Sequence, residues 1–577
     1  MSKKKVRTFG WVQEASTISA LKDVVSVFIK DSEINKKLRE DKIPRLISKE
    51  DGRDEFIRLL EQDKIEIPYN YLKGRGYSKA RGETRATAPC TGIIQATLKG
   101  QRREYQSDWP ADSYLRWAIS IGFLNYNREK DTCSISELGE KYVNATSPSS
   151  EEEALTIAFL SNPPVVRVLT LLERYGHLTK FEIGNQLGFV GEAGFTSIPQ
   201  KLIVQALAED PEERNEILND VEGTSDKYAR MICNWLIQLD WVQQVEKEVT
   251  EYIGGVEYTG IIPQSYILKL KGRTALKRAF GISSTNRVPK IVLWEMLATK
   301  PSDKNYLRNR RATIIEYINK KYRTIEEIQS YLKEKGFSES LSTIKDDLKG
   351  FEQIGLEVKN IEDKYKIMDD IIKLEIPTIV DKKEYEKSYI SELKDIVREK
   401  LNYIPHKYLV LIDLSFDGKS NRDFEIQTIE LLVNELDFNG LRLGESRKPD
   451  GIIYYSKNGI IIDSKAYSKG YSLPISQADE MIRYIEDNKI RDKTQNPTEW
   501  WKHFDDDVEN FNYAFISSIF TGSFEDKLKY IASRTGVNGG AITSANLLLL
   551  AEELKSNNLS YEDTFNLFDN NEEISFL

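Results

Sequence analysis

One pattern recurs three times in the first 370 residues: an amphipathic helix, a turn, and a polar ribbon that alternates like β-strands. It occurs in SYLRWAISIGFLNYNREKDTCSISELG, in SDKYARMICNWLIQLDWVQQVEKE with its return at SYILKLKGRTALKR, and in SLSTIKDDLKGFEQIGLEVKNIEDKYKI. A helix-turn-helix followed by a β-wing is typical of winged-helix modules. More than 100 residues separate the first two copies, which predicts separate domains rather than the units of a solenoid.

The chain is too long for a single hydrophobic core, since it has 577 residues and single cores stop growing at roughly 250–300. Helical periodicity stops in IIKLEIPTIVDKKEY, and a clean helix resumes before Pro405. We therefore predict a multi-domain protein. Its parts are mainly α winged-helix-like (helix-turn-helix) modules at 1–150, 151–285 and 286–370, a linker at 371–383, and an α/β domain at 384–577.

Charge is distributed unevenly along the chain. Residues 384–577 hold 22 Lys and Arg against 34 Asp and Glu, whereas residues 1–383 hold 60 against 57. The slightly basic residues 1–383 favour binding of a polyanion, whereas the acidic residues 384–577 are repelled by a polyanion unless cations neutralise their charge. The cysteines Cys90, Cys133 and Cys233 are far apart, which indicates neither a disulfide framework nor a zinc site. With no apolar run of membrane-spanning length, we expect a cytoplasmic protein without a membrane partner.

The second module carries polar side chains of the kind that a DNA-reading helix uses. Lys227 and Arg230 lie just inside EGTSDKYARM, beside Asn219 and Glu222. Such side chains reach base edges when the second helix of a helix-turn-helix enters the major groove. The alternative is a solvated helix face, because winged helices also bind proteins. In the third module, STIKDDLKGFEQ has acidic residues where phosphate contact favours basic ones, so we expect that module to bind protein.

From residue 384 the sequence predicts an α/β core with a short mixed sheet. The expected order is helix, helix, strand GIIYYS, strand GIIIDSKAY, helix SQADEMIRYIEDN, strand NYAFISSIF and helices to the end. The two adjacent strands form a hairpin around the turn at 456–459.

Two carboxylates and an amine gather at this hairpin. Asp463 and Lys465 point to one side of an extended chain, and strand pairing brings Asp450 near them. Converging carboxylates are costly unless a cation neutralises them, and Mg²⁺ prefers few carboxylates together with a phosphate oxygen. The pattern predicts phosphodiester hydrolysis in which Lys465 balances charge in the transition state, with Glu430 as a candidate outer ligand. The alternatives are a rim salt bridge for the hairpin and a helix-surface charge for Glu430.

Several long motifs point to one family. SRKPDG, DSKAYSKGYSLPISQADEMIRYIEDN and NPTEWWKHF lie in the rear domain, and RTFGWVQ, APCTGIIQATL, HLTKFEIGNQLGFVGEAGFTSIP, EGTSDKYARM and RVPKIVLWEMLAT lie ahead of it. Together they resemble the type IIS restriction endonucleases of the PD-(D/E)xK nuclease superfamily over nearly the full chain. The resemblance implies three recognition subdomains tethered to one nuclease domain. It also implies that Asp450 and Asp463 bind the metal and that Lys465 is the catalytic lysine.

The resemblance implies roles for residues outside the hairpin. Asp479 and Arg483, four residues apart on one helix face, match a pair through which two nuclease domains form a transient homodimer that cuts both strands. Without the resemblance, an intrahelical salt bridge is the default. The DNA contacts that it implies are Gln13, Arg85, Gln101 and Trp109 in the first subdomain and Asn219, Glu222, Lys227 and Arg230 in the second.

Two positions depart from the family pattern. Glu14 follows Gln13 where the family has an amide side chain. An amide bonds adenine through two hydrogen bonds, whereas a carboxylate only accepts and suits cytosine N4. Val221 stands where the family has tryptophan. The GGATG-like target that the resemblance implies is therefore an expectation that depends on Glu14.

The leading hypothesis is a Mg²⁺-dependent type IIS endonuclease of a bacterial cytoplasm. It binds a short asymmetric site in double-stranded DNA and cuts both strands at a fixed distance to one side, and a companion DNA methyltransferase, not stably bound to it, protects the host. The alternatives are a winged-helix DNA-binding regulator with an inert nuclease-like domain and a structure-specific repair nuclease. The acidic helix of the third module also predicts that the nuclease domain rests against the recognition domains until DNA binds.

Overall fold

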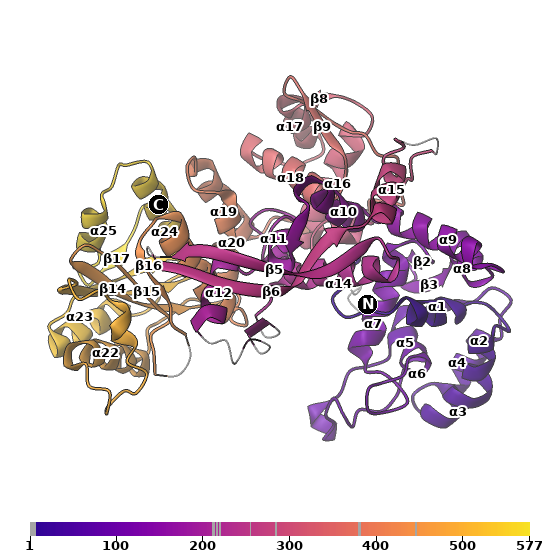
Figure 1. Cartoon of the computed structure of the whole chain (residues 1–577), viewed down its shortest axis with the longest axis horizontal. Helices are drawn as coiled ribbons and strands as arrows, with labels where there is room; N and C mark the ends of the chain where they lie inside the picture. The colour runs from indigo at the N-terminus through magenta and orange to yellow at the C-terminus, as the bar shows by residue number, and fades with distance from the viewer. Residues whose placement is uncertain are drawn as a thin grey trace.

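The structure is a computed structural model that describes residues 7–209, 214, 217–218, 221–253, 256–282, 286–378, 382–444 and 447–577. The C-terminal part, from α19 (Tyr389–Lys400) onward, forms the left side of the molecule in Figure 1, and the preceding elements form its right side and top. Among the described residues, no single helix is long and apolar enough to cross a membrane, and one bent helix pair, Pro148–Ser161 with Pro163–Tyr175, meets that test only jointly.

Three small sheets in the front part share one topology. In each, a strand leads through helices to a longer helix and then to an antiparallel hairpin. The last strand of each sheet lies between the other two, in the orders β1-β3-β2, β4-β6-β5 and β8-β10-β9. Helix-turn-helix followed by a wing has this arrangement, so the prediction of three winged-helix-like modules is confirmed.

The bounds of these elements are as follows. The first module contains α1 (Ile18–Ser26), α2 (Glu33–Lys37), α3 (Ile43–Leu46), α4 (Arg53–Leu60), β1 (Glu66–Pro68), α5 (Tyr69–Lys73), α6 (Ile93–Thr97), α7 (Asp108–Ser120), β2 (Leu124–Asn127), β3 (Thr132–Ile135) and α8 (Glu137–Val143). The second contains α9 (Pro148–Ser161), α10 (Pro163–Tyr175), β4 (His177–Thr179), α11 (Lys180–Gly184), α12 (Gln200–Glu209), α14 (Thr224–Gln238), β5 (Val242–Ile253), β6 (Val256–Leu268) and α15 (Leu270–Ala279). The third contains β7 (Lys290–Ile291), α16 (Lys304–Ile318), β8 (Arg323–Thr324), α17 (Ile325–Glu334), α18 (Leu341–Gln353), β9 (Val358–Ile361), β10 (Lys364–Ile367) and β11 (Ile371–Ile372).

Side chains at the helix starts explain where several of these helices begin. Thr179 accepts a hydrogen bond from the N–H of Glu182, whose carboxylate accepts one from the N–H of Thr179, a capping box that starts α11. Thr324 and Glu327 start α17 in the same way. These local rules make the short helices of the modules predictable from sequence.

The β5–β6 hairpin is far longer than the wings of the other two modules. In Figure 1 it runs from the centre of the molecule to the C-terminal part. Ile253, at the end of β5, is buried in a hydrophobic cluster of the C-terminal part. Val249 and Ile262, nearer the middle of the hairpin, share a cluster with Ile426 of α21 (Asn421–Ile429). The wing of the second module is therefore also a packing surface for the C-terminal part.

A six-stranded mixed sheet organises the C-terminal part. Its order is β12-β13-β14-β15-β16-β17, with antiparallel pairing from β12 to β14 and parallel pairing from β14 to β17. The strands are β12 (Asn439–Arg442), β13 (Gly451–Tyr455), β14 (Asn458–Lys465), β15 (Asn510–Ser517), β16 (Gly539–Thr543) and β17 (Glu573–Ile574). The predicted α/β fold with a central mixed sheet is confirmed, but β12, β16 and β17 were not predicted, and the sequence after β15 was expected to be wholly helical.

Helices cover both faces of this sheet. One hydrophobic core joins it to α19, α20 (Val410–Ser415), α21, α24 (Ser544–Lys555) and α25 (Tyr561–Leu567). A second core, on the other face, joins it to α22 (Ile475–Ile490) and α23 (Phe524–Thr535). Apolar packing on both faces holds the sheet rigid. Residues at the ends of its strands are therefore held in fixed positions.

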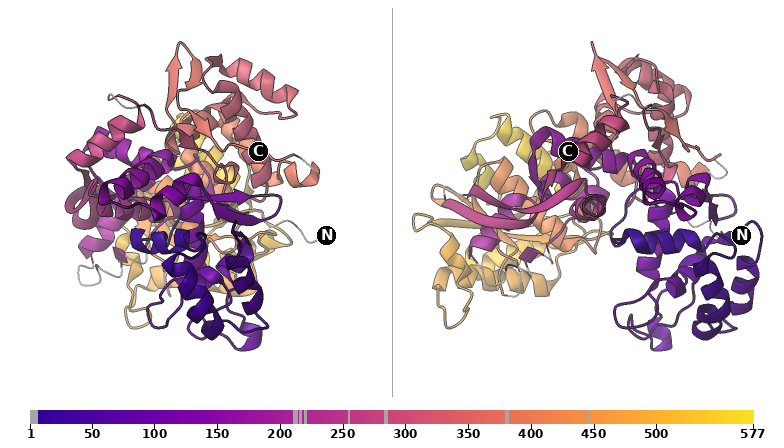
Figure 2. Two further views of the ribbon diagram at one scale, coloured as in Figure 1. Left: turned by 90° about the vertical axis from the view of Figure 1, so that its right-hand side faces the viewer. Right: turned by 45° about the vertical axis from the view of Figure 1, so that its right-hand side comes forward.

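The third module, which stands above the other two in Figure 2, contacts the C-terminal part through α18. Asp346 of α18 accepts a hydrogen bond from Nε of Arg398 in α19 at 2.9 Å and lies 2.9 Å from Nδ1 of His406. Thr343 donates to Asp395 of α19 at 3.1 Å. In the acidic helix that the sequence singled out, Asp346 thus contacts the C-terminal part, whereas Asp347 pairs with Arg310 and Arg311 of α16 within the third module.

Candidate active site and nucleic-acid interface

The β13–β14 hairpin sets two carboxylates side by side. Gly451 pairs with Ile462 across the hairpin, so Asp450 and Asp463, the next residues outward, lie opposite each other. The backbone N–H of Ser464 donates to Oδ2 of Asp450 at 2.6 Å, which fixes the orientation of that carboxylate. The hairpin register therefore brings together two residues that are 13 positions apart in the chain.

The turn of the hairpin differs from the one expected. Tyr455 pairs with Asn458, so the turn consists of Ser456 and Lys457, with Ser456 at a φ of 52°. Asn458 and Gly459 belong to β14 instead of the turn. The tighter turn extends the pairing by two residues and still leaves Asp450 opposite Asp463.

Lys465 places its ammonium between the two carboxylates. Its Nζ lies 2.6 Å from Oδ1 of Asp463 and 3.7 Å from Oδ2 of Asp450. The side chain of Asp463 is only 5% exposed and that of Lys465 is 21% exposed. Partly buried charges at this spacing form a charge cluster at a sheet edge rather than a solvated rim salt bridge.

Burial controls the protonation of this cluster. It raises the pKa of Asp450 to about 6 against the opposing charge of Lys465. Burial raises the pKa of Asp463 to about 7, and the charge of Asp450 adds to that shift while Lys465 opposes it. The pKa of Lys465 is raised because attraction to both carboxylates outweighs burial. Perturbed groups of this kind mark functional sites.

The two carboxylates fit a hard divalent cation. Their charged forms are disfavoured by burial, so a cation that neutralises them gains affinity from the same effect. Among the described residues, no group of three or more His, Cys, Asp or Glu side chains is arranged to hold a metal ion. A cation at Asp450 and Asp463 would therefore take its other ligands from water and from substrate oxygens, as Mg²⁺ commonly does.

Two carboxylates on the helix before β12, Glu425 and Glu430, have different partners. Glu430 accepts a hydrogen bond from Asn434 and lies 3.8 Å from Nζ of Lys407, and its pKa is raised by burial. The charge of Glu425, on α21, raises the pKa of Asp450, and Glu425 pairs with Arg442 at 3.0 Å. Glu425 therefore joins Glu430 as a candidate for the outer-ligand role.

Sequence reasoning also missed Tyr471 and two residues of α22, Glu480 and Tyr484, whose environment is coupled to the cluster. The charge of Glu480 acts on both Asp463 and Lys465. The hydroxyls of Tyr471 and Tyr484 have raised pKa values because of burial and the nearby charges of Asp463 and Glu480. These residues lie 6 to 19 positions after Lys465, and their spacing gave no sign that they would lie near it in the fold.

The two residues predicted for dimerisation lie on the outer face of α22. Asp479 is exposed and accepts a hydrogen bond from the Tyr530 hydroxyl at 3.2 Å. Arg483 is 66% exposed and pairs with Glu480 at 3.3 Å. In this chain Arg483 thus has a different intrahelical partner from the expected Asp479.

Four of the predicted DNA contacts gather where the N-terminal segment meets α14. Gln13 hydrogen-bonds the hydroxyl of Tyr228, and the charge of the exposed Glu14 acts on Arg230. Lys227, one residue before Tyr228, acts through its charge on Asp423 of α21. The first two modules therefore contribute jointly to one polar surface. Asn219 lies outside the described residues.

Glu222, one of the predicted DNA contacts, is paired with two cationic side chains. It accepts hydrogen bonds from Nζ of Lys180 at 2.6 Å and from Nε of Arg230 at 2.8 Å. Only 6% of its side chain is exposed. This geometry orients the guanidinium of Arg230 and leaves the Glu222 carboxylate little room to meet a base. Val221, next to it, packs partly buried against the apolar cluster around α12.

The remaining predicted contacts lie on the first module. Arg85 and Gln101 are exposed on neighbouring loops, which Arg103 ties together by donating to the carbonyls of Ala86 and Ala88. Trp109, at the start of α7, is 46% exposed. Exposed cationic, amide and aromatic side chains on ordered loops suit contact with a nucleic acid backbone.

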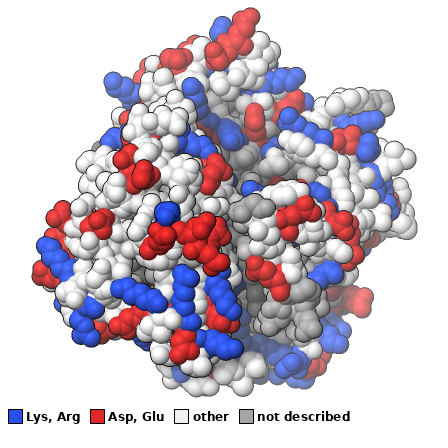
Figure 3. Space-filling model, turned by 60° about the vertical axis from the view of Figure 1, so that its left-hand side comes forward, with Lys and Arg blue, Asp and Glu red and all other residues white. Residues whose placement is uncertain are grey.

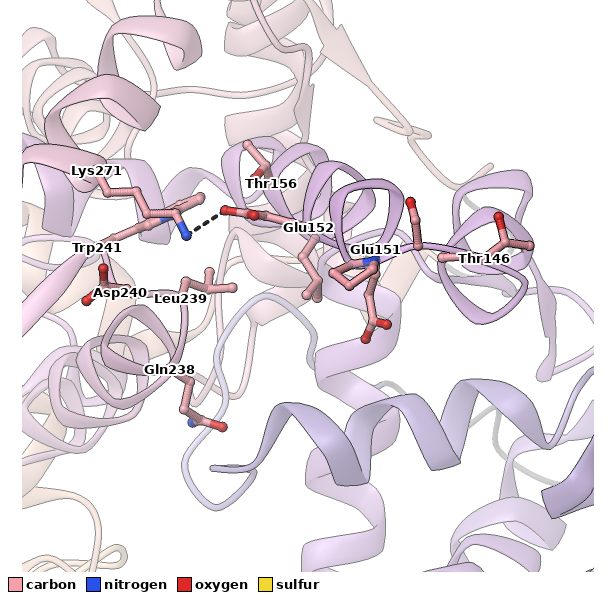
Figure 4. A pocket seen from close by; sticks show the side chains of 13 residues that line it. Thr146, Glu151, Glu152, Thr156, Gln238, Leu239, Asp240, Trp241 and Lys271 are labelled. Carbon is pink, nitrogen blue, oxygen red and sulfur yellow. Dashed lines mark ion pairs between the residues drawn. The ribbon is translucent and has the colours of Figure 1, made fainter.

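Acidic surfaces limit where DNA can lie. The pocket in Figure 4, between α9 and the end of α14, is lined by Glu151, Glu152 and Asp240, and Lys271 pairs with Glu152 at 2.5 Å. On the nuclease-side face in Figure 3, acidic and basic side chains are interspersed, with an acidic group near the centre. Neither surface offers the continuous basic stripe that phosphates favour.

Comparisons with known proteins account for the whole chain. Family models match residues 7–145 (FokI, recognition domain, subdomain 1), 151–284 (FokI, recognition domain, subdomain 2), 297–363 (FokI, D3 domain) and 387–575 (FokI, cleavage domain). The type II restriction enzyme FokI of Planomicrobium okeanokoites is 40% identical over 582 residues, covering 99% of this chain and 100% of that protein. The type II restriction enzyme StsI of Streptococcus sanguinis is 30% identical, covering 96% of this chain and 94% of that protein.

Solved structures agree with the sequence relatives. The structure of restriction endonuclease FokI matches with a TM-score of 0.91 and 39% identity, covering 99% of this chain and 100% of that one. The structure of FokI bound to DNA matches with a TM-score of 0.93 at the same identity and coverage. FokI family models match each part of the chain, and the 40% identity with FokI extends over 99% of it. This chain therefore belongs to the FokI family of type II restriction enzymes.

Proposed function

We propose that this protein is a type IIS restriction endonuclease. It binds a short asymmetric site in double-stranded DNA through its first two modules and hydrolyses a phosphodiester in each strand at a fixed distance outside that site. The observation that carries the proposal is the cluster of Asp450, Asp463 and Lys465 in a chain of the FokI family. The two carboxylates can hold a cation and the ammonium can stabilise negative charge, so all three groups of a phosphodiesterase site are present.

The reaction requires a divalent cation, which we propose is Mg²⁺ held by Asp450 and Asp463. When bound, the cation supplies Lewis-acid stabilisation of charge on the phosphate oxygens. Lys465 positions the attacking water with its ammonium and stabilises the negative charge that grows on the phosphate. The N–H of Ser464 holds the Asp450 carboxylate toward the site. The sheet beneath these residues fixes their spacing.

Cutting of both strands follows from pairing of two nuclease domains. One active site acts on one strand, so a two-fold arrangement supplies the second. Asp479 and Arg483 are exposed on one face of α22, which suits reciprocal ion pairs across an isologous contact. We propose a transient homodimer that forms on DNA.

DNA reading is assigned to Gln13, Glu14, Lys227 and Arg230, with phosphate or sugar contacts from Arg85, Gln101 and Trp109. Glu222 acts by orienting Arg230, and Asn219 is retained as a base-reading residue on the resemblance alone. We propose a GGATG-like site with altered preference opposite Glu14. A methyltransferase of the same bacterial cytoplasm would protect host DNA by modifying that site.

We also propose the domain limits 1–150, 151–285, 286–370 and 384–577, with a linker between the last two. In this arrangement the third module serves protein contact. The contacts of its Asp346 with Arg398 of α19 and with His406 hold the nuclease domain against the recognition modules until DNA binds. This restraint prevents stray cutting.

Incubating the purified protein with plasmid and Mg²⁺, followed by run-off sequencing of the ends, tests the proposal. A single motif at a fixed offset from both cuts is the expected result. Asp450→Ala that still cleaves would refute the active site, and preference for branched DNA over any linear motif would favour a repair nuclease. Tight sequence-specific binding without any cutting would favour a regulator.

A further inference from the structure

Two tyrosines that follow the β13–β14 hairpin stack on each other. The rings of Tyr467 and Tyr471 have centroids 5.2 Å apart and planes inclined by 17°. Tyr471 is 1% exposed, whereas Tyr467 is 43% exposed. The Tyr467 ring is therefore supported from behind by a buried ring, while much of its side chain is open to solvent. An exposed aromatic ring on a rigid support offers a large contact area with a defined orientation.

The two tyrosines lie beside the catalytic cluster. The ring of Tyr471 packs near that of Phe515 on β15, with centroids 6.3 Å apart. Phe515 is the register partner of Asp463 across the parallel β14–β15 pair, so the two side chains leave the same face of the sheet from Cα atoms about 5 Å apart. Tyr467 follows Lys465 by two residues, which places its Cα atom within about 7 Å of that of Lys465.

Hydrogen bonds hold the backbone of both tyrosines in place. The N–H of Tyr467 donates to the carbonyl of Ser415 at 2.8 Å, and its carbonyl accepts from Oγ of Ser518 at 2.6 Å. The N–H of Tyr471 donates to the carbonyl of Ile519 at 2.7 Å. The Tyr467 side chain thus starts from a fixed point next to the active site, as a group that positions a substrate requires.

The part of DNA that suits this ring is the sugar. A phosphodiester beside Lys465 carries a deoxyribose on each side, so a sugar comes to the distance at which Tyr467 lies. Cleavage outside the recognition site acts on any sequence, and contacts with phosphate and sugar position DNA without reading it. Stacking of a base on Tyr467 would instead require a nucleotide to leave the duplex stack, which costs free energy.

We propose that Tyr467 is a substrate-positioning residue whose ring packs against the deoxyribose next to the scissile phosphate. The contact sets that phosphate at the cluster in the same place whatever base it carries, and Tyr471 keeps the ring from yielding. The inference deepens the proposed function and rests on it.

Single-turnover cleavage by the full-length protein at saturating Mg²⁺ tests the inference. Tyr467→Ala should lower the cleavage rate on the order of 10-fold, because a displaced phosphate reacts slowly. It should also spread the cuts over neighbouring phosphates in run-off sequencing, which a loss of stability alone does not do. Tyr467→Phe keeps the ring and should retain the wild-type rate and cut positions. Binding to the recognition site in gel shifts should be unchanged in both variants.

Tyr455→Ala is the matched control. Tyr455 is also 43% exposed and stacks on another tyrosine, Tyr561, with centroids 4.2 Å apart and planes inclined by 10°. It lies at the turn end of the same hairpin, away from the end next to Asp450. Thermal unfolding should show comparable losses of stability for Tyr455→Ala and Tyr467→Ala, but only Tyr467→Ala should slow and spread the cuts. Equal slowing in both would assign the effect to stability and overturn the inference.

A duplex with an abasic nucleotide at the cut separates sugar contact from base stacking. The wild type should cut it at the rate of the intact duplex. A loss as large as that of Tyr467→Ala would place the ring on the base and overturn the sugar contact. Wild-type rate and cut positions in Tyr467→Ala would overturn its role altogether. Failure of the wild type to cut DNA of any sequence would instead refute the proposed function.

Discussion

The buried aspartates predict a steep dependence of cation binding on pH. The pKa is about 6 for Asp450 and about 7 for Asp463, both raised by burial. A carboxyl with a raised pKa keeps its proton to higher pH, and metal binding must displace that proton, so cation affinity rises with pH. The fraction of molecules with both carboxylates charged falls from roughly 70% near pH 7.5 to roughly 1% near pH 5.5, so affinity should weaken about 100-fold.

Calorimetric titration with Mg²⁺ over this pH interval measures the effect. Repeating it in buffers of different ionisation enthalpy should show proton release near pH 6 and almost none near pH 8. In the cation-free protein the same shifts make stability fall as pH rises from about 4 towards 7, because the folded state holds protons that the unfolded state has lost. An affinity that changes less than about threefold would refute the reasoning, since carboxyls of ordinary pKa stay charged throughout the interval.

Four further outcomes are expected. Lys465→Met should lower the cleavage rate on the order of 10²–10³-fold at saturating Mg²⁺ without weakening specific DNA binding in gel shifts, and weakened binding would instead indicate a structural role. Asp346→Asn removes the negative charge that faces Arg398 and His406 and should loosen the docked nuclease domain by about 1–3 kcal/mol, seen as more non-specific nicking; nicking equal to the wild type would leave the restraint unsupported. Arg483→Ala should reduce double-strand cuts more than first-strand nicks, which time courses on supercoiled plasmid resolve, and equal loss of both would argue against dimer action. Glu14→Gln should move preference at one base pair towards adenine by about 1–3 kcal/mol in selection from randomised sites, and an unchanged motif would remove Glu14 from base reading.

Local patterns predicted the modules and the hairpin because short-range rules govern both. The continuous apolar run before Asp463 specifies β14 as a buried strand, and strand geometry alone puts Asp463 and Lys465 on one side. The strand β16, GGAIT, was missed because two glycines weaken its strand pattern, whereas parallel pairing with β15 stabilises it. Tertiary pairing of this kind is absent from any short window of sequence.

Long-range placement explains the other differences. Glu425 and Glu430 lie on one continuous helical segment, and only the packing of α21 on the sheet decides which of them acts on Asp450. Burial of Glu222 between Lys180 and Arg230 likewise depends on contact between α11 and α14. The residues predicted from motifs lie in the expected regions of the fold. Their ion-pair partners, however, depend on contacts between elements that are far apart in the chain.

The long β5–β6 hairpin limits how freely the nuclease domain can be transplanted. Ile426 is 3% exposed and belongs to an apolar cluster that includes Val249 and Ile262 of the hairpin. A nuclease domain fused to an unrelated DNA-binding protein would carry this apolar patch uncovered, together with the surface that receives Ile253. Such patches promote association between molecules. Transfer of the nuclease domain to another protein therefore requires a polar substitution at Ile426 or retention of the β5–β6 hairpin with the domain.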